Sequence, residues 1–116
     1  MKSVEVFTKM GKALETHGAE IVKKVGCMYH FELSEKKGDP ATTVTVDLKN
    51  GNGKITMGAE GKPDATFIML DADFMDLVNG KLKSQDAFMQ GKMKIKGNMA
   101  KAMKFNPSVL PKDAKL

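Results

Sequence analysis

The sequence predicts a single α+β domain, in which a five-stranded and mostly antiparallel sheet carries helices on one face. Three observations lead to this prediction. The chain has 116 residues, which is enough for one hydrophobic core but not for two. Apolar side chains repeat at helix spacing in some segments and at strand spacing in others. The order is helices, four strands, helices, a strand and a helix. We therefore expect one domain over residues 1–116.

The first helix is expected over residues 3–17, where apolar side chains recur every three or four positions from Val4 and Phe7 onward. Gly18 is expected to end this helix, because glycine commonly occupies the position after a helix. Residues 19–24 are then expected to form a short second helical piece.

Four strands are expected in the middle of the chain. Residues 25–33 and 42–48 alternate apolar and polar side chains with a period of two, as in half-buried strands. Residues 54–57 and 65–70 are shorter segments of the same kind. The intervening segments are rich in Gly, Asn, Asp and Pro, and residues 50–53 (NGNG) are expected to reverse the chain tightly.

Two helices should follow the fourth strand. The first is expected over residues 71–78 with Asp71 as its N-cap, and the second over residues 84–90 with Ser84 as its cap. Asp73 would lie near the positive end of the first of these helices.

The last elements are a strand, a helix and a tail. Met93 and Ile95 alternate with lysines in a fifth strand that shows one charged face. A final helix is expected over residues 99–105. Residues 106–116 contain two prolines, so we expect an extended tail.

Chemistry-bearing residues are few. Two histidines and Cys27 show no metal-ligand spacing, so neither a metal nor a cofactor is expected. The three carboxylates in residues 71–78 are explained better by capping and the helix dipole than as an acid–base cluster. An enzyme mechanism would have to use Asp73 or His30, and the glycine turns match no phosphate-binding motif. We therefore expect no catalysis.

The charge pattern limits the class of partner. All nineteen basic residues are lysines, and the net charge is +5. The absence of arginine weighs against sequence-specific nucleic-acid recognition, which relies on the guanidinium fork. Between Lys81 and Lys104 there are seven lysines and one acid, Asp86. This segment is either a solvated face or a surface that contacts anionic lipid headgroups.

Two further features bear on function. The chain has ten methionines, which fit either an ordinary core or a pliable apolar pocket wall. The carboxyl end Ala114-Lys115-Leu116 is a close variant of the Ser-Lys-Leu peroxisomal address, and it follows a segment that we expect to be exposed.

Several short motifs resemble the sterol carrier protein type 2 family in their order and spacing. They are DADF at 71–74, GK at 80–81, AFMQGK at 87–92, GNM at 97–99 and AMK at 102–104. The resemblance implies a five-stranded sheet with helices over one face and a hydrophobic tunnel between the two layers. It also implies binding and movement of sterols, fatty acids, fatty acyl-CoAs and phospholipids without catalysis. Val44 stands where some members carry a bulky aromatic side chain, which affects the width of the tunnel mouth.

The resemblance leads to specific expectations for the site. The expected wall consists of Phe7, Met10, Leu14, Val44, Val46, Phe67, Met69, Phe74, Leu77, Phe88, Met89, Met99 and Met103. Gln90 is expected either near the polar head of the lipid or as a partner for backbone groups at a helix end. The expected contacts with anionic membranes or CoA phosphates are Lys92, Lys94, Lys96, Lys101 and Lys104.

These expectations describe a monomeric lipid carrier of the peroxisomal matrix with a pool in the cytoplasm. Its partners would be the lipid, a transiently contacted anionic membrane and the peroxisomal import receptor, which would read Ala114, Lys115 and Leu116. Such domains also occur fused to peroxisomal β-oxidation enzymes. The alternative function is therefore a substrate-presenting accessory module of such an enzyme.

Overall fold

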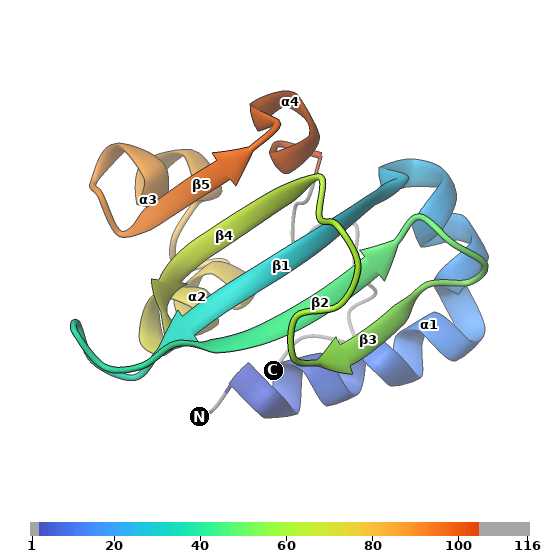
Figure 1. The fold of residues 1–116 in the computed structure, drawn as a ribbon, viewed down its shortest axis with the longest axis horizontal. Coiled ribbons are helices and arrows are strands. Elements are labelled where there is room, and N and C mark those ends of the chain that lie inside the picture. Colours follow the sequence, from blue (N-terminus) through green and yellow to red (C-terminus); the bar gives the residue numbers. More distant parts are fainter. Residues whose placement is uncertain (1–2, 105–116) are drawn as a thin grey trace.

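The computed structural model describes residues 3–104, which fold into one sheet and four helices (Figure 1). The elements in chain order are α1 (Ser3–Val25), β1 (Cys27–Ser34), β2 (Thr42–Leu48), β3 (Lys54–Met57), β4 (Ala65–Leu70), α2 (Asp71–Val78), α3 (Ser84–Met89), β5 (Met93–Gly97) and α4 (Met99–Ala102). The expected α+β class is confirmed. The tail over residues 106–116 lies outside the described residues. The last helix ends at Ala102 and not at the expected residue 105, because residues 103 and 104 form a turn.

The sheet has the strand order β3-β2-β1-β4-β5. Three neighbouring pairs are antiparallel, and the central pair of β1 and β4 is parallel. On the central strand, Phe31 lies opposite Val44 of β2 and Phe67 of β4. Side chains of one pleat face are therefore aligned across the middle of the sheet.

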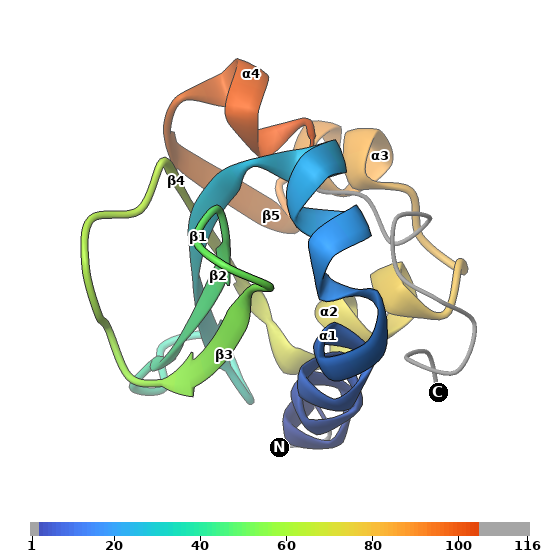
Figure 2. The same cartoon turned by 90° about the vertical axis from the view of Figure 1, so that its right-hand side faces the viewer.

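The two faces of the sheet are covered differently (Figure 2). Helices α1 and α2 pack on one face, which carries the buried alternate residues of β1, β2 and β4. The connection from β3 to β4 crosses the other face. Two side chains of the sheet hold this connection. Thr45 Oγ1 donates to the carbonyl oxygen of Gly58 at 2.6 Å, and His30 Nε2 lies 2.8 Å from the carbonyl oxygen of Glu60. This crossing brings β4 beside β1 in the parallel sense.

The expected division of the first helical segment at Gly18 is wrong. Helix α1 runs without interruption from Ser3 to Val25, where two helical pieces were expected. A Cβ atom on Gly18 would lie 1.9 Å from the carbonyl oxygen of Asn52, in the turn before β3. Glycine is required here because α1 passes very close to that turn, and not because the helix ends.

Two expected helix caps are also corrected. Helix α2 has Leu70 as its N-cap residue and begins at Asp71, because β4 leads into the helix without an intervening loop. Helix α3 has Lys83 as its N-cap residue and begins at Ser84. Asn98 caps α4 as a side-chain acceptor, with its Oδ1 3.0 Å from the backbone nitrogen of Lys101. None of the helices among residues 3–104 has the length and apolar character needed to cross a membrane.

The contact at Gly18 predicts that Gly18→Ala lowers the free energy of unfolding by about 2–3 kcal/mol, as for other overpacked sites. Gly11→Ala is the matched control in the same helix, since its Cβ would lie 4.0 Å from Cγ1 of Ile55. Gly11→Ala should raise the free energy of unfolding by about 0.5–1 kcal/mol through helix propensity. Urea denaturation of both variants measures the difference, and equal effects would contradict the packing argument.

Candidate functional site

An apolar layer fills the space between the sheet and the pair α1 and α2. Nine of the residues expected in the wall meet in this layer, each exposed by no more than 5%. They are Phe7, Met10 and Leu14 of α1, Val44 and Val46 of β2, Phe67 and Met69 of β4, and Phe74 and Leu77 of α2. Helix spacing and strand alternation direct these side chains toward one another. The structure thus brings most of the expected wall together.

Five aromatic rings occupy the middle of the layer. Phe7 stacks on Phe74 and Phe31 stacks on Phe67, each pair with ring centroids 5.0 Å apart. Phe31 also meets Phe74 edge-on at 5.5 Å, and Tyr29 lies 5.5 Å from Phe67. Sequence reasoning missed this cluster, because aromatic residues form only 6% of the chain and are widely spaced along it. The period-two pattern around Phe31 was the available signal.

The other wall candidates lie elsewhere. Phe88 and Met89 of α3 are 43% and 75% exposed, and Met99 of α4 and the adjacent Met103 are 42% and 48% exposed. Gln90 follows α3 as its C-cap residue and is also exposed. The structure therefore does not bring these five side chains into the buried layer.

The methionines differ from the expectation of a methionine-rich wall. Only three of those in the described part of the chain are buried, namely Met10, Met69 and Met93. The interior is formed mainly by aromatic and aliphatic side chains.

The basic residues expected to contact phosphates fall into two groups. Lys92, Lys94, Lys96 and Lys104 are exposed. Lys101 differs, because its Nζ forms an ion pair with Oδ1 of Asp64 at 3.1 Å.

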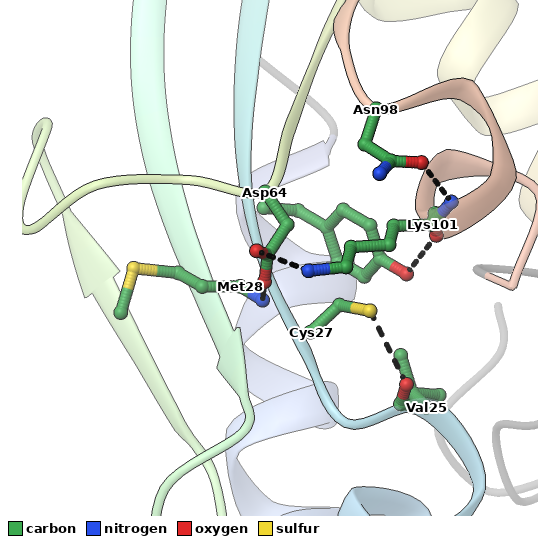
Figure 3. Close-up of polar contacts among 7 residues, drawn as sticks. Val25, Cys27, Met28, Asp64, Asn98 and Lys101 are labelled. Carbon is green, nitrogen blue, oxygen red and sulfur yellow. Dashed lines mark hydrogen bonds and ion pairs between the residues drawn. The ribbon is translucent and has the colours of Figure 1, made fainter.

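A polar clamp formed by Asp64, Lys101, Tyr29 and Met28 joins α4 to the sheet. Figure 3 shows the contact of Asp64 with Lys101 and with Met28. Asp64 Oδ2 accepts from the backbone N–H of Met28 at 2.9 Å, while Oδ1 of the same carboxylate holds Lys101. The Tyr29 hydroxyl donates to the carbonyl oxygen of Lys101 at 2.6 Å. The clamp escaped sequence reasoning because its members lie far apart in the chain.

Two pKa values in the clamp are shifted. The backbone hydrogen bond from Met28, and then the ammonium of Lys101, lower the pKa of Asp64. Burial, and then the hydrogen bond with Cys27, raise the pKa of Tyr29 far above its ordinary value. At neutral pH, Asp64 is therefore a carboxylate and Tyr29 a neutral hydroxyl donor.

The remaining polar features of residues 3–104 concern metal ligands, the single cysteine and a surface pocket. Residues 3–104 contain no group of three or more His, Cys, Asp or Glu side chains that could hold a metal ion. Cys27 is buried, and its Sγ donates to the carbonyl oxygen of Val25. A separate surface pocket of about 500 Å³ opens between α1 and β3. Its lining includes Lys12, Glu15 and Lys54 as well as Leu14 and Ile55.

Comparisons with known proteins agree on one family. The profile of the SCP-2 sterol transfer family matches residues 7–109. Sterol carrier protein 2 of Homo sapiens is 43% identical over 112 residues, covering 96% of this chain and 20% of the relative. Sterol carrier protein 2 of Arabidopsis thaliana is 41% identical over 120 residues, covering 100% of this chain and 96% of the relative. Peroxisomal multifunctional enzyme A of Dictyostelium discoideum is 43% identical over 101 residues, covering 86% of this chain and 22% of the relative. The chain thus spans about a fifth of the human and Dictyostelium relatives.

Solved structures give the same result. Apo sterol carrier protein 2 from Yarrowia lipolytica has a TM-score of 0.77 at 32% identity, with 86% of this chain and 90% of that chain covered. Sterol carrier protein 2 from Aedes aegypti in complex with palmitate has a TM-score of 0.73 at 28% identity, with 94% of each chain covered.

The clamp predicts that Asp64→Asn lowers the free energy of unfolding at pH 7 by about 1 kcal/mol, a modest effect because Lys101 is 43% exposed. A carboxylate with a lowered pKa stabilises the fold above its ordinary pKa of about 4, and this contribution is lost as the pH falls further. The difference between wild type and variant should therefore disappear in acid. Denaturation across pH tests this, with the exposed Asp39→Asn as control. A difference that persists at pH 2 would contradict it.

Proposed function

Because the chain belongs to the SCP-2 sterol transfer family, we propose that it is a carrier that binds an apolar lipid between the sheet and the helices α1 and α2. The observation that carries this proposal is the layer of nine buried apolar side chains described above. Among the side chains whose burial the structure describes, three polar or charged ones are buried: His30, Thr45 and Asp71. His30 and Thr45 contact the connection on the opposite face of the sheet, so they leave the layer apolar.

The chemistry of this layer favours broad selectivity. Burial of lipid surface against it contributes roughly 25 cal/mol per Å², and this term is not directional. An apolar wall discriminates weakly between guests of similar size. The proposed ligand classes are those that the family resemblance implies: fatty acids, sterols, fatty acyl-CoAs and phospholipids. The palmitate complex of the Aedes relative supports the first of these.

The exposed α3 and α4 residues are not part of the proposed wall. Phe88, Met89, Met99 and Met103 are each more than two-fifths exposed, whereas the nine wall residues are buried. The lipid chain is thus proposed to contact the rings of the core and the aliphatic side chains around them.

We place the protein in the peroxisome, with a pool in the cytoplasm. The carboxyl-terminal Ala114-Lys115-Leu116 supports this location, since it is a close variant of a peroxisomal address. The similarity to a peroxisomal multifunctional enzyme gives further support. The import receptor that reads this tripeptide is the proposed protein partner.

A second candidate function is a substrate-presenting module of a longer β-oxidation enzyme. The alignment of this chain with about a fifth of two relatives favours it. The two candidates differ in whether the protein alone transfers lipid between membranes. A carrier does so unaided, whereas a presenting module binds lipid without transferring it.

The carrier proposal predicts that a fluorescent fatty acid binds with micromolar or tighter affinity. Met69→Gln should weaken this binding about tenfold, because the nearly isosteric amide places polar groups without hydrogen-bond partners against the apolar lipid. Met57→Gln, at a methionine that is 53% exposed on β3, is the matched control and should bind like wild type. Circular dichroism checks that both variants are folded.

Two outcomes of this titration are informative, as is one outcome of a separate assay of lipid transfer between vesicles. A well-folded wild type that binds neither a fatty acid nor a sterol probe would remove the carrier proposal. Equal affinities of Met69→Gln and Met57→Gln would show that the wall is assigned to the wrong layer. Binding without unaided transfer between two vesicle populations would support the presenting module.

The proposed location predicts that a fluorescent protein fused to the amino terminus of this chain enters peroxisomes. Lys115→Glu should leave the fusion outside, because the change reverses the charge in the middle of the address. Lys112→Glu is the matched control beyond the tripeptide. Microscopy with a peroxisomal marker gives the readout, and import of the Lys115→Glu variant would contradict the assignment.

A further inference from the structure

Strand β5 lies at an edge of the sheet, and among residues 3–104 its only strand neighbour is β4 (Figure 1). Every second residue of an edge strand directs its backbone N–H and C=O away from the sheet, where another strand can bind them. Strand β3, at the other edge, has four residues, whereas β5 has five. The longer edge of the sheet is therefore open to pairing with a further strand.

One face of β5 is apolar. Met93 is buried, and Ile95 is half-buried against the core. In the register of the sheet, Ile95 lies opposite Phe67, which in turn lies opposite Phe31. Ile95 is thus the last member of an apolar row that crosses the helix-covered face. A strand added outside β5 would place a side chain beside Ile95 and extend this row.

The other face of β5 is basic. Lys94 and Lys96 alternate with the apolar residues and are both exposed. Lys94 lies opposite Ile68 of β4, and Lys96 lies opposite Thr66, so neither lysine faces a carboxylate on the adjacent strand. The first acid in the row of Lys94 is Glu32, which lies two strands away. The described strands therefore supply no counter-charge directly beside either ammonium group.

We propose that β5 docks an extended acidic segment of a partner protein, which adds to the sheet as a new edge strand. The side chains of this segment alternate, with carboxylates beside Lys94 and Lys96 on one face and an apolar residue beside Ile95 on the other. Backbone hydrogen bonds along the free edge hold the segment, and the alternating side chains select its sequence. The inference goes beyond the carrier function, because it uses none of the nine wall residues.

The charge of β5 favours an acidic strand over a second copy of this chain. Opposite charges on directly paired strands stabilise a sheet, whereas like charges destabilise it. Two copies that pair through β5 bring the lysines of both molecules together. An acidic strand instead supplies the counter-charge that the sheet lacks at this edge. The net charge of +5 also attracts an acidic segment from a distance at low salt.

Titration with a fluorescently labelled peptide of alternating glutamate and valine tests the proposal. Two control peptides separate strand addition from simple charge attraction. One has the same composition with its glutamates and valines in two separate blocks, and the other is the alternating peptide with every amide N-methylated. At low salt the alternating peptide should bind about tenfold more tightly than either control, because only it can pair both its backbone and its side chains with β5.

The lysines of β5 have their own variant. Lys94→Gln with Lys96→Gln should weaken binding of the alternating peptide about fivefold at low salt, because two cross-strand charge pairs are lost. Lys36→Gln with Lys37→Gln, in the exposed turn after β1, is the charge-matched control and should bind like wild type. Equal losses in both double variants would overturn the proposal, as would a wild type that binds the alternating and control peptides equally.

Amide chemical shifts in NMR spectra of the full chain locate the bound peptide. The largest changes should fall on residues 93–97, and the other edge strand, at residues 54–57, should be unaffected. Largest changes on β3 or on α1 would place the peptide elsewhere and overturn the proposal. A wild type that dimerises through β5 and excludes the peptide would assign the edge to a second copy, and would also overturn it.

Titration with a fluorescent fatty acid separates this inference from the carrier function. The double variant of Lys94 and Lys96 should bind the fatty acid like wild type, because these lysines lie on the face opposite the proposed wall. Loss of fatty-acid binding in this folded variant would place the lysines at the lipid site and overturn the proposal. A wild type that binds the peptide but no lipid probe would support docking and end the carrier proposal alone.

Discussion

The packing of aromatic rings around Phe31 holds the two layers of this fold together. Phe31 lies on the central strand and contacts rings from α1, α2 and β4. These elements come from both halves of the chain, so the ring contacts form only when the sheet and its covering helices are assembled. The same contacts define the layer in which we place the lipid. Stability and the proposed carrier function therefore depend on one set of side chains, and a lipid bound there would have to be accommodated among them.

The sequence was informative wherever periodicity determines which way a side chain points. It predicted the five strands, the helices that follow β4 and the burial of nine of the proposed wall residues, because spacing alone selects a face. It did not predict the parallel pairing of β1 with β4, since alternation identifies a strand but not its neighbour. Gly18 was misassigned for a related reason. Its role is set by the carbonyl oxygen of Asn52, which is distant in sequence.

The exposed methionines show the same limit more clearly. The pattern of α3 and α4 correctly indicates apolar side chains but does not reveal whether another layer covers them. Helix α3 has only six residues and lies at the edge of the sheet, so part of its apolar surface stays uncovered. The clamp of Asp64, Lys101 and Tyr29 could not be predicted from the sequence either. It depends on partners that only the tertiary fold brings together.

The lysines of β5 have a consequence for self-association. An edge strand exposes unpaired backbone groups that can template pairing with the edge of another sheet, and charged side chains at that edge oppose such pairing. Lys94 and Lys96 occupy the exposed positions of β5, so two molecules that approach edge to edge bring like charges together. The protein can thus present an apolar surface in water with electrostatic protection against aggregation through its own strands.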